Sequence, residues 1–203
     1  SGPSPYNHFI KPGPHELLLV DMALGFRRAR LRNVYSILRG KDLVTEEFSD
    51  ERREEQFGVL RQAQDYVLDL QNWHEFLKSL ILAGFRGQSM ISSHVGLMYS
   101  YAMFLIGRRD FGVDLGTLKR TIARWFFMVS LTSRYSSSPE TTMEQDLALL
   151  RSVKDPAGFI RALDGVIEAT LTDDYWGITL PNDQLATSAS RSPALYAYYA
   201  ALN

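Results

Sequence analysis

The sequence contains no cysteine among its 203 residues. This absence excludes disulfide frameworks, thiolate catalysis and zinc sites built on cysteine, and it fits a reducing compartment such as the cytoplasm. An excess of either charge is also absent, since 22 basic and 23 acidic residues give a formal net charge of −1. Such a balance argues against a strongly cationic nucleic-acid binder, although it leaves room for a local basic surface.

Long apolar runs are scarce as well. Residues 87–107 carry no charge, but they include polar side chains such as Gln88, Ser92, His94 and Ser100. This mixture predicts a buried central helix and not a membrane span. The N-terminus has no basic region followed by an apolar run, so no secretory signal is recognisable and no membrane partner is expected.

The sequence is rich in helical periodicity. Apolar residues recur at spacings of three and four from the N-terminal region onward, which predicts a first helical region that ends at Gly40. Its members are Leu17, Val20, Leu24, Leu31, Val34, Tyr35 and Leu38. No alternating β-branched run is long enough for a confident strand, and residues 176–181 are the best candidate for a short extended segment. The prediction is an all-α fold with at most that one extended segment.

Helix starts are marked by residues that cap and by proline. Ser49 is expected to cap one helix, and the pairs at 138–139, 155–156 and 192–193 place Ser or Asp before Pro at a first helical position. Residues 1–4 are expected to be a cloning remnant or linker. Residues 5–203 are expected to form one helical domain excised from a longer protein, because an apolar helix at the C-terminus is left uncapped.

Catalytic motifs are missing. There is no phosphate-binding glycine loop and no nucleophile elbow, and the histidines lack metal-ligand spacing. His94 is expected to be a hydrogen-bonded core histidine. Asp173 and Asp174 are most simply solvated, although with His94 they are the candidates for an enzyme site. The sequence therefore predicts no catalytic residue, no metal ligand and no cofactor.

Two groups of arginines are candidates for binding. Arg28, Arg32 and Arg39, the arginine stripe, fall within about 40° on an ideal helix, with Tyr35 nearby, a pattern that suits phosphate contact. An ordinary solvated or ion-paired face is the simpler interpretation, since net charge is near zero.

The second group lies further along the chain. Arg120 and Arg124 share one face of a helix whose core side includes Trp125, and Arg134 follows in a turn, where its fork could bind helix-end carbonyls or an anion.

The segment ARWFFMVSLTSRYSSSPETTMEQDLALL, with ATSASRSPALYAYYAALN further on, resembles the helical region of GmrSD-like restriction endonucleases. The resemblance covers about residues 118–150 and 187–203. Its most specific residues are Arg124, Trp125, Arg134, Tyr135, Glu140 and Thr141.

The resemblance implies a function for the longer protein. Relatives of this kind begin with a ParB-like domain that hydrolyses nucleotide, often end in a His-Asn-His nuclease domain, and act against phage DNA, often modified DNA. This chain would then be a non-catalytic middle domain that contacts the flanking domains and DNA, through Arg28, Arg32, Arg39, Arg124, Arg134 and Tyr135. A helical protein-interaction scaffold and, less simply, an enzyme domain are the alternatives, and the oligomeric state stays open.

Overall fold

The computed structural model describes residues 9–42, 45–185, 197 and 201, and in these residues it contains helices and no β-strand. The predicted all-α class is confirmed. The α-helices of this part of the chain are α1 (Pro14–Phe26), α2 (Leu31–Leu38), α3 (Asp50–Leu68), α4 (Leu70–Leu82), α5 (His94–Arg109), α6 (Leu115–Thr132), α7 (Pro139–Leu149) and α8 (Pro156–Thr170). Short 3₁₀ turns, η1 (Gln88–Met90) and η2 (Leu150–Ser152), and a π-helical segment, η3 (Tyr175–Leu185), complete the order.

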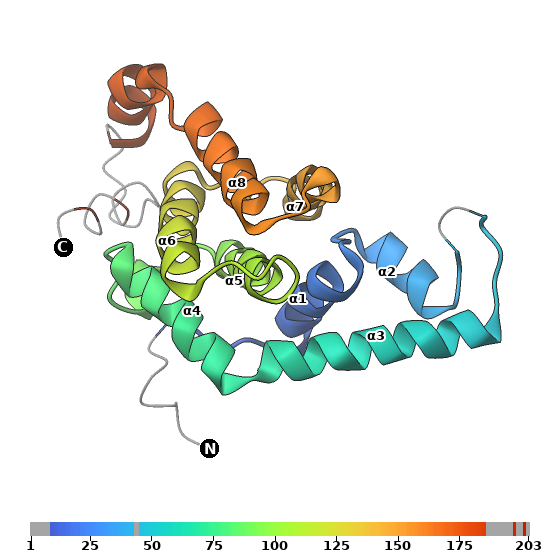
Figure 1. Ribbon diagram of the computed structural model, residues 1–203. Coiled ribbons are helices and arrows are strands. Elements are labelled where there is room, and N and C mark those ends of the chain that lie inside the picture. The colour runs from blue at the N-terminus through green and yellow to red at the C-terminus, as the bar shows by residue number, and fades with distance from the viewer. Residues whose placement is uncertain (1–8, 43–44, 186–196, 198–200, 202–203) are drawn as a thin grey trace.

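Helix α5 lies in the middle of the molecule, with α1, α4 and α6 packed around it (Figure 1). The Ser93 hydroxyl caps its start by accepting the Gly96 N–H at 3.0 Å. All residues from 96 to 107 are buried, as the uncharged segment predicts. In the described part of the chain, no helix is both long enough and apolar enough to cross a bilayer.

Helices α6 and α8 approach α5 closely at Gly107, because glycine has no side chain. A Cβ atom at Gly107 would lie 2.7 Å from Leu118 of α6 and 2.7 Å from Phe159 of α8. Trp125 of α6 fills the same core and is only 1% exposed, as the apolar stripe of this helix predicts. The core therefore joins α6 and α8 to the centre of the domain.

The first helical region consists of two helices, and the expected placement of Arg28 on one helix with Arg32 and Arg39 is wrong. Arg27 adopts a left-handed conformation with φ 54°, and the chain leaves α1 there before α2 begins at Leu31. Helix α2 stands apart from the central helices (Figure 1) and packs on a small separate cluster with Met22, Val34 and Ile37 at its centre. Arg28 consequently lies in the connection, whereas Arg32 and Arg39 belong to α2 and its end.

The expected extended segment at 176–181 is also wrong, since these residues lie within the π-helical turns of η3. Thr172 accounts for the difference. Its hydroxyl accepts the Tyr175 N–H at 3.2 Å, and its carbonyl accepts the Trp176 N–H at 3.1 Å. These contacts start a helical turn, and the acidic Asp173 and Asp174 are favourable at a helix start.

The predicted helix starts agree with the structure where it describes them. Ser49 accepts the Arg52 N–H at 3.2 Å, and Asp155 accepts the Gly158 N–H at 2.6 Å. Helix α7 begins at Pro139 directly after Ser138, although the serine side chain makes no capping bond. The start at 192–193, the C-terminal helix and most of the resemblance at 187–203 lie outside the described residues.

Candidate nucleic-acid interface

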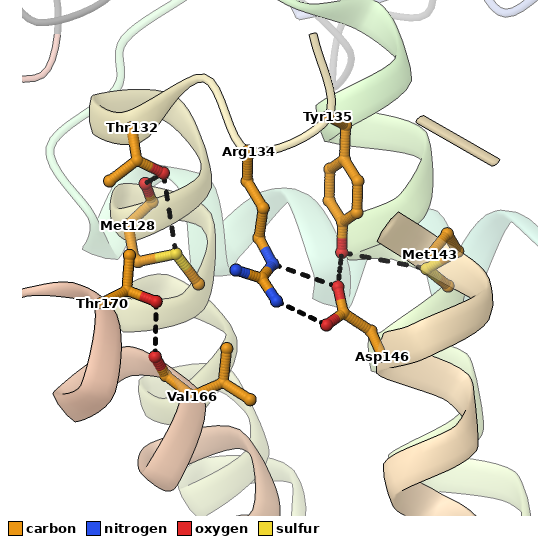
Figure 2. A network of polar contacts seen from close by, with 8 residues as sticks. All are labelled: Met128, Thr132, Arg134, Tyr135, Met143, Asp146, Val166 and Thr170. Atoms are coloured by element: carbon orange, nitrogen blue, oxygen red, sulfur yellow. Dashed lines mark hydrogen bonds and ion pairs between the residues drawn. The ribbon is translucent and has the colours of Figure 1, made fainter. Parts of the chain in front are cut away.

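The turn between α6 and α7 contains a buried ion pair. Asp146 of α7 is 2% exposed, and its carboxylate accepts two hydrogen bonds from Arg134, at 3.1 Å from Nε and 2.6 Å from Nη2 (Figure 2). The Tyr135 hydroxyl donates to the same carboxylate at 2.7 Å. A planar guanidinium fork matches a carboxylate in this two-bond geometry. The anion that Arg134 binds therefore belongs to the chain itself.

The surroundings of Arg134 favour its charged form. Burial disfavours the charged form of Arg134, but the hydrogen bonds and charge of Asp146 outweigh burial, and the pKa of the guanidinium is raised. Burial and the Asp146 charge together raise the pKa of Tyr135 well above its ordinary value. The Arg134 guanidinium also lies over the ring of Trp125, 5.7 Å from its centroid. Tyr135 is thus an interior residue of the junction, and Arg134 is part-buried, with its guanidinium engaged by Asp146.

Helix α7 also holds the start of α2. The Glu144 carboxylate accepts the Ala29 N–H at 2.7 Å and the Arg30 N–H at 3.4 Å, and it accepts a third bond from the Arg28 guanidinium at 2.7 Å. One turn earlier, Glu140 accepts the Leu31 N–H at 3.0 Å. Two glutamates thus satisfy free N–H groups at the positive end of α2, where a negative charge is favourable.

These capping contacts give Arg28 and Glu140 roles other than the predicted ones. Burial raises the pKa of Glu144, but the hydrogen bonds from Ala29 and Arg28 outweigh burial, and its pKa is lowered. Arg28 is therefore a partner of Glu144 and not a member of an exposed stripe. Glu140, part of the resemblance, acts as a helix cap, and Thr141 lies half-buried in the first turn of α7.

The exposed face of α2 retains the other two stripe residues. Arg32 and Arg39 are exposed, and Tyr35 lies between them along the helix with 66% of its surface exposed. Among the described residues, no side-chain partner reaches the Arg32 guanidinium. Phe48, which is 57% exposed, comes to the same face from the connection before α3. We call Arg32, Tyr35, Arg39 and Phe48 the α2 face.

Arg39 lies close to both aromatic rings of the α2 face. Its guanidinium carbon is 5.6 Å from the Tyr35 centroid and 5.5 Å from the Phe48 centroid. Interactions with aromatic rings leave the N–H edges of a guanidinium available, because the cation lies over a ring face. The face can therefore offer hydrogen-bond donors to an anion and flat apolar surfaces to a second group.

The remaining predicted arginine, Arg124, lies on a different side of the molecule. It is paired with Asp164 of α8 at 2.9 Å and lines an apolar groove of about 490 Å³ between α4, α6 and α8. The groove residues are Leu82, Ala83, Arg120, Ala123, Arg124, Phe127, Ile167, Leu171 and Trp176. Arg124 is consequently not a neighbour of the α2 face.

Among the described residues, no hydrogen bond or ion pair joins the candidates for an enzyme site. His94 was expected to be a core residue, but the structure places it at the surface. It starts α5 with 44% of its side chain exposed, and its Nδ1 lies 3.4 Å from a Glu16 oxygen. Asp173 and Asp174 are exposed at the start of the π-helical segment. The described ranges hold no group of three or more His, Asp or Glu side chains placed to bind a metal.

Residue-by-residue reading of the sequence missed the two acidic partners. Glu144 contacts residues 28–30, which lie more than a hundred positions away in the sequence. Asp146 contacts residues 134–135, which lie about a dozen positions away. The two residues are two positions apart in a helix that contains both polar and apolar side chains, and this spacing matches no sequence pattern that predicts an ion pair. The one available signal was the surplus of arginines at 27–32 without a nearby acid, which requires acidic partners from elsewhere in the chain.

Comparison with known proteins finds no matching family model, no matching curated protein and no matching solved structure. The resemblance to restriction endonucleases stays a prediction.

Proposed function

We propose that this chain is the non-catalytic helical middle domain of a phage-defence, modification-dependent restriction protein, and that it contacts DNA phosphates through the α2 face. In the longer protein the domain would link a nucleotide-hydrolysing domain to a nuclease domain, as the resemblance implies. The observation that supports DNA contact is the pair Arg32 and Arg39, two exposed arginines on one side of a helix that is anchored at its start.

The local charge around α2 supports this choice of surface. Residues 26–41 include six basic residues and no acidic residue. Three of them are engaged in ion pairs: Arg27 with Asp110, Arg28 with Glu144, and Lys41 with Glu46. Arg32 and Arg39 have no such pair among the described residues, so their charge is available to a phosphate.

The neighbouring start of α3 limits the size of the contact. Asp50 and Glu51 occupy its first turn and are exposed, and a phosphate backbone would be repelled there. Arg52 and Arg53 are paired with Asp42 and Asp50 and do not reverse this acidic character. The contact that we propose is therefore confined to α2 and involves about two phosphates, too few for tight binding by this domain alone.

A salt titration of DNA binding tests the proposal. Each phosphate contact releases condensed counterions, so removing one arginine should lower the slope of log affinity against log salt by about one. We expect Arg32→Ala with Arg39→Ala to lower the slope by about two, for every DNA sequence tried. Circular dichroism should show an unchanged helical fold, because exposed charges contribute little to stability.

Arg161→Ala is the matched control, since Arg161 is an exposed arginine on α8 with only a distant pair to Asp155 at 3.9 Å. This variant should keep the wild-type slope. Equal slopes for the wild type and the α2 double variant would remove α2 from the DNA interface.

The apolar groove supports a second candidate function, a protein-interaction scaffold. Leu82 and Trp176 in its lining are 58% and 43% exposed, which is typical of residues that contact a partner. Absence of DNA binding at any salt concentration would favour this scaffold over the DNA-contacting domain.

A further inference from the structure

We propose that the two aromatic rings of the α2 face, Tyr35 and Phe48, stack on a nucleobase that is not paired in a duplex, while Arg39 between them binds the adjoining phosphate. The inference rests on the proposed function, because it specifies which form of DNA the α2 face prefers. The occupant is thus an unpaired nucleotide within or beside a DNA duplex.

The exposure of the rings is the first observation. Tyr35 and Phe48 are 66% and 57% exposed, although each has a large apolar ring that most folds would bury. Each ring contributes to the cluster around the Arg39 guanidinium and still has wide contact with solvent. Exposed aromatic rings beside a cation are the means by which proteins bind unstacked bases.

The backbone fixes the position of Phe48, which is the second observation. Lys41 and Phe48 form an isolated antiparallel bridge, and the Ser49 N–H donates to the Gly40 carbonyl at 3.2 Å. Gly40 has φ 82°, and a Cβ atom there would lie 2.3 Å from the Ser49 carbonyl oxygen. Only glycine permits this close approach, so the chain is built to bring Phe48 back against the end of α2.

The anchored start of α2 fixes the other ring. Glu140 and Glu144 bind the N–H groups of residues 29–31, and Tyr35 lies one turn further along the helix. Both rings are therefore held before any ligand arrives. A surface that is ordered in advance loses less conformational entropy on binding.

The chemistry of the face selects the form of DNA. In a paired duplex the flat faces of the bases are covered by neighbouring bases, and only phosphates and base edges are accessible. The arginines Arg32 and Arg39 suffice for phosphates, but the rings would then have no partner. An unpaired base offers its flat surface to Tyr35 and Phe48 and an adjoining phosphate to Arg39. An apolar protein partner is less favoured, because the guanidinium of Arg39 between the rings would lose water without an acidic group to replace it.

The test compares two duplexes of identical length, one fully paired and one with a single bulged 2-aminopurine. Fluorescence anisotropy gives the affinity for each, and 2-aminopurine emission reports stacking. We expect the wild type to bind the bulged duplex about tenfold more tightly, in line with one base–aromatic stack, and to quench the probe. Tyr35→Leu and Phe48→Leu should each reduce this preference severalfold, because leucine is apolar but has no flat ring.

Matched variants separate stacking from other effects. Tyr35→Phe should keep the preference, and Trp176→Ala, which removes an exposed aromatic ring on another side, should keep it too. Tyr35→Leu should retain the wild-type salt slope, since the arginines remain. Equal affinity of the wild type for the two duplexes, or a preference that survives in Tyr35→Leu, would overturn the inference and leave the phosphate contact in place. Failure of both duplexes to bind would overturn the proposed function itself.

Discussion

Buried carboxyl groups have contrasting roles in this domain. Asp146 accepts bonds from Arg134 and Tyr135, and Glu75 of α4 accepts bonds from Lys78 and Lys119, which lower its pKa. Asp21 of α1 has no such support. It is 2% exposed, its Oδ1 has no hydrogen-bond partner among the described residues, and burial raises its pKa from 3.8 to about 7.

The Asp21 carboxyl should make stability depend on pH. Its proton is held more tightly in the folded protein than in the unfolded chain, so the associated stability is complete below about pH 4 and is lost as pH rises toward 7. We expect the unfolding free energy of Asp21→Asn, relative to the wild type, to increase by about 2–4 kcal/mol between pH 4 and pH 8. Urea unfolding at several pH values measures this difference.

Asp65→Asn is the control for this experiment, because Asp65 is an exposed carboxylate on the neighbouring helix α3. Its pH profile should match the wild type. If the pH profile of Asp21→Asn also runs parallel to that of the wild type, Asp21 is either ionised in the folded protein or protonated throughout. Burial would then not determine the pKa of Asp21.

Among the helices, α2 depends most on contacts from elsewhere. It has eight residues, and isolated helices of this length are not stable in water. It packs on a cluster with only three buried residues, Met22, Val34 and Ile37. The glutamates of α7 therefore contribute strongly to its position, through the N–H groups of residues 29–31.

Removing the Glu144 side chain should destabilise the domain measurably. Glu144→Ala leaves the Ala29 and Arg30 N–H groups without their acceptor and the Arg28 guanidinium without its partner. We expect a loss of about 2–3 kcal/mol in unfolding free energy, the sum of a lost helix cap and a lost charged hydrogen bond. Gln145→Ala, the exposed neighbour on α7, should change stability by no more than about 0.5 kcal/mol. An equal effect of the two substitutions would mean that α2 does not need this cap.

For the molecule as a whole, the sequence predicted local features well and long-range contacts poorly. The all-α class, a buried helix within residues 87–107 (observed as α5 at 94–109) and the caps at Ser49 and Asp155 follow from periodicity and short-range hydrogen bonds, which span a few residues. The start of α2 and the part-buried position of Arg134, by contrast, involve Glu144 and Asp146 of α7. No local pattern shows which helix a distant carboxylate will face, so the acidic partners of Arg28, Arg124 and Arg134 could not be identified from the sequence.

We expect the isolated domain to have no nuclease or nucleotide-hydrolysing activity. The sequence holds no phosphate-binding loop and no His-Asn-His pattern. Incubation of highly purified protein with plasmid DNA or nucleoside triphosphates, with and without divalent metal, measures this. Metal-dependent cleavage that His94→Ala abolishes would show that the domain is an enzyme.

The hydrogen bonds that connect α7 to the start of α2 have a consequence for sequence variation. Glu140 and Glu144 bind peptide N–H groups of residues 30 and 31, and every amino acid except proline supplies that donor. In related sequences, positions 30 and 31 could therefore change freely with respect to this contact, while positions 140 and 144 would have to keep an acceptor. Apart from the side-chain pair of Arg28 with Glu144, the contact would therefore appear as constraint on α7 only, and methods that infer contacts from paired substitutions would overlook its backbone hydrogen bonds.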